Sequence, residues 1–134
     1  MTRLANEVRL ACQLVSHKVR FESGAPLPPH QLSVLFKLRR GSMTPGELAD
    51  AEQVTAPSMT KTLATLESQE LVERCGDPGD GRRRIISITP TGEAALRDAA
   101  TVRDSFMENL LATLSDDERA TLAEAARILR RVLE

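Results

Sequence analysis

The apolar residues of this chain recur mostly every three or four positions, which predicts a mainly helical protein. Leu4, Val8, Ala11, Val15 and Val19 form one face of a first helix within residues 2–22. The same spacing, together with helix-start signals, predicts further helices along the rest of the chain. They lie at residues 31–40, 44–53, 55–66, 91–113 and 115–133, and residues 115–118 are expected to cap the last one, with Ser115 and Glu118 at the spacing of a capping box.

Two short helices in the middle of the chain are marked by their first residues. Thr44 and Glu47 have the spacing of a capping box, in which each side chain bonds the backbone N–H of the other, and Pro45 stands at the first helical position. Thr55 is the expected N-cap of the second helix, and Pro57 lies in its first turn. Only a tight turn separates the two helices, so this region is predicted to be a helix-turn-helix.

The second of these helices has two distinct faces. Met59, Leu63 and Leu66 recur at i, i+4 and i+7 and should face the core. The opposite face carries hydroxyls and one cation, which are side chains that hydrogen-bond phosphates and base edges. The candidate DNA-binding residues of this helix are Pro57, Ser58, Thr60, Lys61 and Thr62.

A basic β-hairpin is predicted directly after this helix. An extended segment begins at Leu71, residues 77–81 are dense in turn formers, and Ile85, Ile86 and Ile88 make the return strand. Arginine suits the narrow, electronegative minor groove of DNA, and three arginines follow the turn. They are Arg82, Arg83 and Arg84. The predicted fold class is therefore mainly α with a small β-hairpin wing, a winged helix-turn-helix.

These residues resemble the MarR family of bacterial transcription factors. The matching stretches are Thr44-Pro45-Gly46-Glu47-Leu48-Ala49, Pro57-Ser58-Met59-Thr60-Lys61 followed by Leu63, Leu66 and Glu67, Leu71-Val72-Glu73-Arg74, and Asp80-x-Arg82 ending in Ile88-Thr89-Pro90-x-Gly92. The outer helices also fit the family plan, so the resemblance covers nearly the whole chain. It implies a homodimer that binds pseudo-palindromic double-stranded DNA, usually as a repressor released by a small ligand or by oxidation.

The resemblance also implies roles for particular residues. Ser58, Thr60 and Lys61 would face the major groove. Arg82 would enter the minor groove, held by the nearby Asp80.

The chain departs from the family pattern at two positions. Glu70 stands where the family usually has a glycine after the second helix, which affects the helix C-cap. Lys61 stands where arginine is more common, and lysine reads a base edge without the bidentate geometry of arginine.

The terminal segments are predicted to form dimerisation helices around the winged region. We expect one protomer over residues 1–134, with the winged helix-turn-helix at 28–90 and dimerisation helices at 2–22 and 91–133. A small winged domain has too little surface to cover the apolar positions of both ends, such as Phe106 and Leu110. A homodimer interface is therefore expected, although a monomeric helical core has the same periodicity.

Composition changes this picture little. The formal net charge is -1, so the positive field expected at the wing comes from the contiguous arginines and not from overall charge. No apolar run approaches the roughly 20 residues that span a bilayer, and we expect a cytoplasmic protein that contacts no membrane. Cys12 and Cys75 are too isolated to suggest a disulfide framework.

The sequence does not favour an enzyme. His17 and His30 are the only histidines, and neither belongs to a metal-binding pattern, so no catalytic residue, metal ligand or cofactor is predicted. A winged-helix module that binds only proteins remains the alternative, because this scaffold does not determine its function.

The sequence leaves two alternatives for the signal that would release the expected regulator from DNA. A small lipophilic or aromatic ligand would lodge between the dimer helices and the DNA-binding lobe, with His17, Arg20 or Arg39 as polar contacts. The alternative is a redox switch at Cys12, which lies about where peroxide-sensing members of the family keep their reactive thiol. By resemblance those members hold the thiolate with tyrosine hydroxyls, and this chain has no tyrosine.

Overall fold

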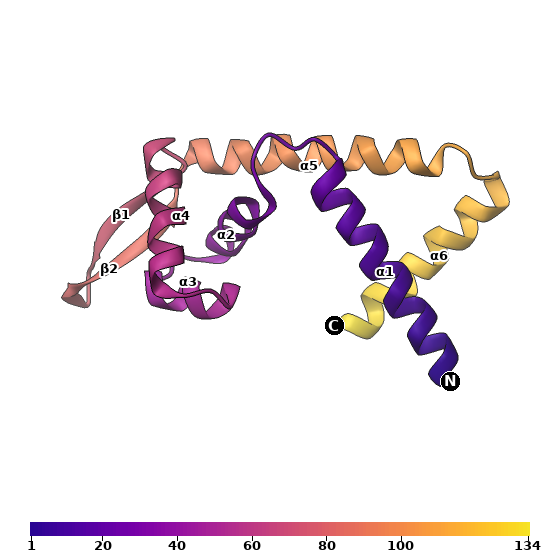
Figure 1. Cartoon of the computed structure of the whole chain (residues 1–134), viewed down its shortest axis with the longest axis horizontal. Helices are drawn as coiled ribbons and strands as arrows, with labels where there is room; N and C mark the ends of the chain where they lie inside the picture. The colour runs from indigo at the N-terminus through magenta and orange to yellow at the C-terminus, as the bar shows by residue number, and fades with distance from the viewer. The chain divides into compact units, whose positions relative to one another are not determined.

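A computed structural model describes residues 1–134 as helices followed by one hairpin and two more helices (Figure 1). The elements in order are α1 (Thr2–Glu22), α2 (Pro29–Arg40), α3 (Pro45–Glu52), α4 (Ala56–Ser68), β1 (Val72–Asp77), β2 (Asp80–Ile88), α5 (Pro90–Leu111) and α6 (Asp116–Leu133). The predicted fold class is confirmed. The chain divides into two compact units, residues 1–103 and 104–134. None of the helices combines the length and apolar character needed to cross a membrane.

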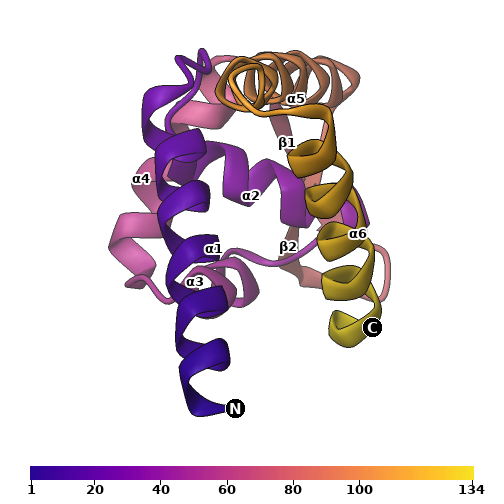
Figure 2. The ribbon, with the colours of Figure 1, turned by 90° about the vertical axis from the view of Figure 1, so that its right-hand side faces the viewer.

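The core of the first unit lies where α2, α3, α4 and the base of the hairpin meet. Figure 2 shows α2 crossing in front of α4 on one side and of the hairpin on the other. Each of these elements contributes buried apolar side chains, as the sequence pattern predicts for one face of each helix. The cluster consists of Val34, Leu35, Leu38, Leu48, Ala49, Met59, Leu63, Leu66, Leu71, Val72 and Ile86.

Both predicted caps of the helix-turn-helix are present. The Thr44 hydroxyl accepts from the Glu47 N–H at 3.1 Å, and the Glu47 carboxylate accepts from the Thr44 N–H at 3.2 Å, which completes the capping box. The Thr55 hydroxyl accepts from the Ser58 N–H at 3.2 Å at the start of α4. Gln53 ends α3 with a left-handed φ of 56°, and the chain turns there into α4.

The hairpin is antiparallel and reaches further toward its turn than the apolar pattern indicated. Val72 pairs with Ile88 and Cys75 with Ile85, and an irregularity follows Gly76. The return strand begins at Asp80, within the predicted turn at 77–81, and it includes the three wing arginines. In Figure 1 the hairpin leaves the lobe beside α4, and its turn projects beyond α3 and α4.

The hairpin base is held on two sides. Met43, just before α3, exchanges two backbone hydrogen bonds with Ile86 of β2, at 3.1 and 2.7 Å. The Arg74 guanidinium of β1 forms an ion pair with Glu67 of α4. The Met43 bridge was not predicted from the sequence, because a single paired residue has no periodicity.

Glu70 explains how α4 ends without a glycine. Its φ is 60°, in the left-handed region. Its N–H donates to the Glu67 carbonyl at 2.9 Å, and the Leu71 N–H donates to the Leu66 carbonyl at 3.0 Å. These two bonds form a Schellman motif, so the geometry usually supplied by glycine is present with a glutamate in its place.

The start of α5 packs tightly against this helix end. The Thr89 hydroxyl donates to the Glu70 carbonyl at 2.6 Å, and the Thr89 N–H donates to the Leu71 carbonyl at 3.1 Å. A Cβ on Gly92 would stand 2.2 Å from the Leu71 carbonyl oxygen and 2.7 Å from the Ile88 side chain. Only glycine fits this contact, which joins the end of α4, the end of β2 and the start of α5.

Helix ends differ slightly from the predicted ones. The second helix begins at Pro29 and not at Gln31, because proline at a first helical position needs no hydrogen-bond partner for its nitrogen. The long helix runs from Pro90 to Leu111, and the Leu114 N–H then bonds the Leu111 carbonyl before the cap of α6. That cap is the predicted Ser115–Glu118 capping box.

Replacing Glu70 with glycine should stabilise the protein. The left-handed conformation costs a residue with a Cβ about 1–2 kcal/mol, part of which is offset by the greater freedom of glycine in the unfolded chain. We expect Glu70→Gly to raise the free energy of unfolding by about 1 kcal/mol in a denaturant titration. Gln69→Gly is the control, because Gln69 has a φ of -94° and no such strain to relieve. Equal effects of the two substitutions would contradict the assignment.

Candidate nucleic-acid interface

The outer face of α4 is mostly polar because the large apolar residues of this helix are used in the core. Met59, Leu63 and Leu66 are at most 1% exposed. Thr62 on the remaining surface is half-buried. Pro57, Ser58, Thr60 and Lys61 are exposed. All five candidate residues therefore lie outside the buried stripe of α4, and four of them are exposed.

Hydrogen bonds within α4 decide what these side chains can offer a ligand. The Thr60 hydroxyl donates to the Ala56 carbonyl at 2.9 Å, so its oxygen remains free to accept a hydrogen bond. Lys61 takes part in none of the ion pairs, which leaves its ammonium free to donate. The free Thr60 oxygen can accept a hydrogen bond from an exocyclic amino group of a base. The Lys61 ammonium can donate to a phosphate or to the acceptor edge of guanine.

The three wing arginines have different surroundings. Arg82 and Arg84 are exposed and take part in no ion pair. Arg83 lies between two carboxylates, 2.7 Å from Glu47 and 3.7 Å from Asp77. The wing thus presents two free guanidiniums and one that is already paired.

Asp80 contacts Arg82 through the backbone. Its carboxylate accepts from the Arg82 N–H at 3.0 Å, which stabilises the start of β2 after the turn. On the other side of the turn the Asp77 carboxylate accepts from the Gly79 N–H at 2.8 Å. The resemblance implied that Asp80 holds the arginine itself, and in this structure it holds the peptide that carries it.

Glu47 combines two tasks at the start of α3. Hydrogen bonds from Thr44 lower the pKa of the Glu47 carboxyl below its ordinary value, and the neighbouring Arg83 lowers it further. The same hydrogen bonds that lower the pKa let one carboxylate cap the helix and pair with the wing at the same time.

The residues proposed for a ligand pocket lie in two places. His17 and Phe21 of α1 have ring centroids 4.7 Å apart, and the Arg20 guanidinium lies 5.7 Å from the Phe21 ring centroid. Arg39 is on the exposed side of α2. The structure groups the two candidates of α1 with an aromatic ring and does not bring Arg39 into that group.

Arg103 of α5 was not among the residues predicted from the sequence. Its side chain is half-buried, its Nε has no hydrogen-bond partner, and no ion pair involves it. Burial lowers the pKa of Arg103, and the positive charge of Arg20 lowers it further. A signal was present in the sequence, because Arg103 precedes Phe106 by three positions and Leu110 by seven, and so falls on the apolar face of α5.

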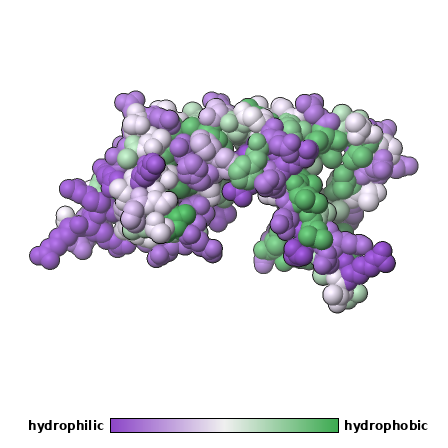
Figure 3. All heavy atoms as spheres, viewed as in Figure 1, coloured by the Kyte–Doolittle hydropathy of each residue, from purple (hydrophilic) through white to green (hydrophobic).

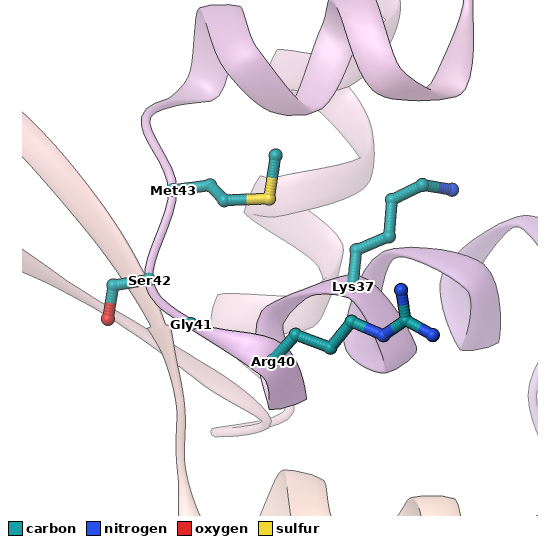
Figure 4. A pocket seen from close by; sticks show the side chains of 5 residues that line it. All are labelled: Lys37, Arg40, Gly41, Ser42 and Met43. Atoms are coloured by element: carbon teal, nitrogen blue, oxygen red, sulfur yellow. The ribbon is translucent and has the colours of Figure 1, made fainter. Parts of the chain in front are cut away.

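An open hollow lies at the end of α2, next to the residue that bridges to β2. It is lined by Lys37, Arg40, Gly41, Ser42 and Met43. Figure 4 shows the Lys37 and Arg40 side chains extending to one side and Ser42 pointing to the other. Lys37 is paired with Glu52 at 2.6 Å and Arg40 stacks on Phe36, so both cations already have partners.

The remaining candidate groups are metal ligands and thiols. No group of three or more His, Cys, Asp or Glu side chains is placed to hold a metal ion. Cys12 and Cys75 are free thiols on exposed positions of α1 and β1.

Comparison with known proteins gives a consistent assignment. A family profile described as the MarR family matches residues 25–83. The HTH-type transcriptional regulator Mb0904 of Mycobacterium bovis is 37% identical over 129 residues, which cover 95% of this chain and 90% of that protein.

Solved structures agree in fold over almost the full length. Wild-type MarR of Escherichia coli in its apo form is 26% identical with a TM-score of 0.77, covering 98% of this chain and 96% of that one. A mutant of Staphylococcus aureus MepR bound to an oligodeoxyribonucleotide is 21% identical with a TM-score of 0.68, covering 98% of each chain. These relatives are regulators or share the regulators' fold, and none of them is named as an enzyme.

Proposed function

Because this chain belongs to the MarR family of transcriptional regulators, we propose that it is a repressor of its own or neighbouring genes. It binds a pseudo-palindromic operator in double-stranded DNA as a homodimer and is released by a small ligand. The proposal rests on one observation: α4 has an accessible polar face, and the adjacent wing carries two arginines without ion-pair partners, Arg82 and Arg84.

The two surfaces have different tasks on DNA. The α4 face fits the major groove, where Thr60 and Lys61 can contact base edges and Ser58 can contact phosphate. Arg82 and Arg84 have the charge and reach to enter a neighbouring minor groove, whose potential attracts guanidinium groups. The oligodeoxyribonucleotide bound to the MepR mutant, a protein of the same fold, supports DNA as the ligand.

Exposed apolar surface on the terminal helices supports a homodimer. Neither α1 nor α6 contains a buried residue. Leu14 and Phe21 of α1 are 69% and 59% exposed, and Val132 of α6 is 67% exposed. Figure 3 shows the apolar side chains of α1 as a green area on the surface. Burying such faces against a second copy removes apolar area from water, which is the main source of stability in obligate dimers.

Unpaired cations support an anionic ligand as the signal. Arg20 and Arg103 raise the local positive potential, and Arg103 has given up part of its hydration without gaining a partner. A carboxylate would relieve both effects, and the neighbouring Phe21 and His17 rings suit an aromatic or lipophilic acid. Such a ligand releases DNA only if it binds the DNA-free state more tightly than the DNA-bound state.

Substitutions in the wing and in α4 should affect DNA binding differently, because the wing contributes charge and α4 contacts bases. Arg82→Ala should weaken binding to all sequences and reduce the slope of log K against log salt by about 0.9 for each phosphate that Arg82 neutralises. Lys61→Ala and Thr60→Ala should instead change the preferred bases, measured by selection from a random duplex pool. Arg9→Ala, on the face of α1 opposite its apolar stripe, is the control. Wild-type behaviour of all three variants would show that the interface has been misplaced.

The oligomeric state should depend on the apolar stripe of α1. Val15→Asp places a carboxylate in the middle of that stripe, where dimerisation would bury it without a partner, so we expect dissociation at micromolar concentration. Size-exclusion chromatography with light scattering measures the mass. Gln13→Asp, on the opposite face of α1, should remain a dimer. A wild-type protein that is a stable monomer would rule out the dimer.

Control by a ligand and control by oxidation predict different DNA binding for the Cys12→Ser variant. Because no tyrosine is present to support a thiolate, Cys12→Ser should keep full DNA affinity, and an aromatic acid should raise the melting temperature and weaken DNA binding of wild type and variant alike. Electrophoretic mobility shifts with and without peroxide decide between them. A fall in DNA binding that peroxide causes, thiol reverses and Cys12→Ser abolishes would establish the redox switch instead.

A further inference from the structure

Arg83 joins the wing to the helix-turn-helix. Its guanidinium donates to Glu47 Oε1 at 2.7 Å, across 36 residues of sequence, and its other amino group lies 3.7 Å from Asp77 Oδ2. The arginines on either side, Arg82 and Arg84, have no such partner. A charge-assisted contact of this kind fixes direction as well as distance.

The acceptor in this contact is itself held in place. Glu47 Oε1 also accepts from the Thr44 N–H at 3.2 Å, and the Thr44 hydroxyl accepts from the Glu47 N–H at 3.1 Å. The Glu47 side chain therefore has one orientation set by the helix cap, and Arg83 binds to a fixed point on α3. The rotamer freedom that weakens most surface ion pairs has been reduced on one side before the pair forms.

The Arg83–Glu47 contact lies on the part of the hairpin that is nearer the turn. Nearer the lobe, the hairpin is anchored by the Met43–Ile86 bridge and by the Arg74–Glu67 ion pair. Arg83 lies closer to the turn than Ile86 does, so its contact restrains the part of the wing that projects from the lobe. Without it, the projecting segment would be held only by the pairing of its own two strands.

We propose that Arg83 is a positioning residue, which sets the direction of the wing through Glu47 of α3 and does not itself contact DNA. The proposal rests on the DNA-binding function proposed above. It assigns the DNA contacts of the wing to Arg82 and Arg84 alone, so the three contiguous arginines have two distinct roles.

Two substitutions remove the contact from opposite ends. Arg83→Gln removes the cation, and Glu47→Gln removes the charge while keeping an amide oxygen that can still cap the Thr44 N–H. Because both remove the Arg83–Glu47 contact, each should weaken DNA binding by about two- to fivefold for a half-exposed pair, and Arg83→Gln also removes the longer contact to Asp77. The double variant should be no weaker than Arg83→Gln alone. Arg83→Lys, which keeps the charge, should recover part of the affinity.

Fluorescence anisotropy with the selected operator over a range of salt concentrations tests this assignment. The proposal predicts that the salt slope of Arg83→Gln and Glu47→Gln equals that of wild type, while Arg82→Gln lowers it by about 0.9 for each phosphate that Arg82 neutralises. A lower slope for Arg83→Gln, together with unchanged or tighter binding of Glu47→Gln, would show that Arg83 contacts phosphate and that Glu47 competes for it. That result would overturn the proposal, as would wild-type affinity of both variants.

Amide hydrogen exchange of the DNA-free protein gives a second readout that does not depend on DNA binding. Breaking the Arg83–Glu47 pair should speed exchange of the backbone amides near the turn in both variants, with the exchange of the α4 amides unchanged. Unchanged exchange near the turn would overturn the positioning role. A wild-type protein that binds no DNA would overturn the proposed function, and the exchange rates would then decide alone whether Arg83 restrains the wing.

Discussion

The burial of one side of α4 holds the winged helix-turn-helix lobe together. Met59, Leu63 and Leu66 fill the centre of the core, with at most 1% of their surface exposed, and α2, α3 and the hairpin all pack around them. A helix with its apolar stripe fixed in this way cannot rotate without exposing that surface to water. Its hydroxyls and Lys61 are therefore held outward without any interaction of their own being required.

A second constraint sets the wing and α5 relative to α4. Thr89 bonds both Glu70 and Leu71, and Gly92 approaches the Leu71 carbonyl too closely for any side chain. The left-handed Glu70 turns the chain into this junction at a cost in backbone strain. Because α4, β2 and α5 meet there, these contacts fix the start of α5 against the elements that carry the candidate DNA contacts.

The sequence predicts those features whose cause is local. The capping boxes at Thr44 and Ser115 and the apolar stripe of α4 each depend on residues a few positions apart, and all were predicted correctly. The extent of β2 was underestimated, because arginines carry no apolar alternation to mark a strand. Features that depend on distant residues were not predictable in this way. The Met43–Ile86 bridge and the Arg83–Glu47 pair join segments that only the folded chain brings together, so the three wing arginines are equivalent in the sequence and distinct in space.

In the proposed complex, two copies of this chain present their two α4 helices to one face of a DNA duplex. The most direct test is hydroxyl-radical footprinting of the wild-type protein on duplexes enriched from a random pool. We expect a two-fold symmetric sequence with two equivalent protected half-sites, whose centres are about 10 bp apart. A single asymmetric footprint, or no sequence enrichment at salt concentrations where the protein is folded, would contradict it.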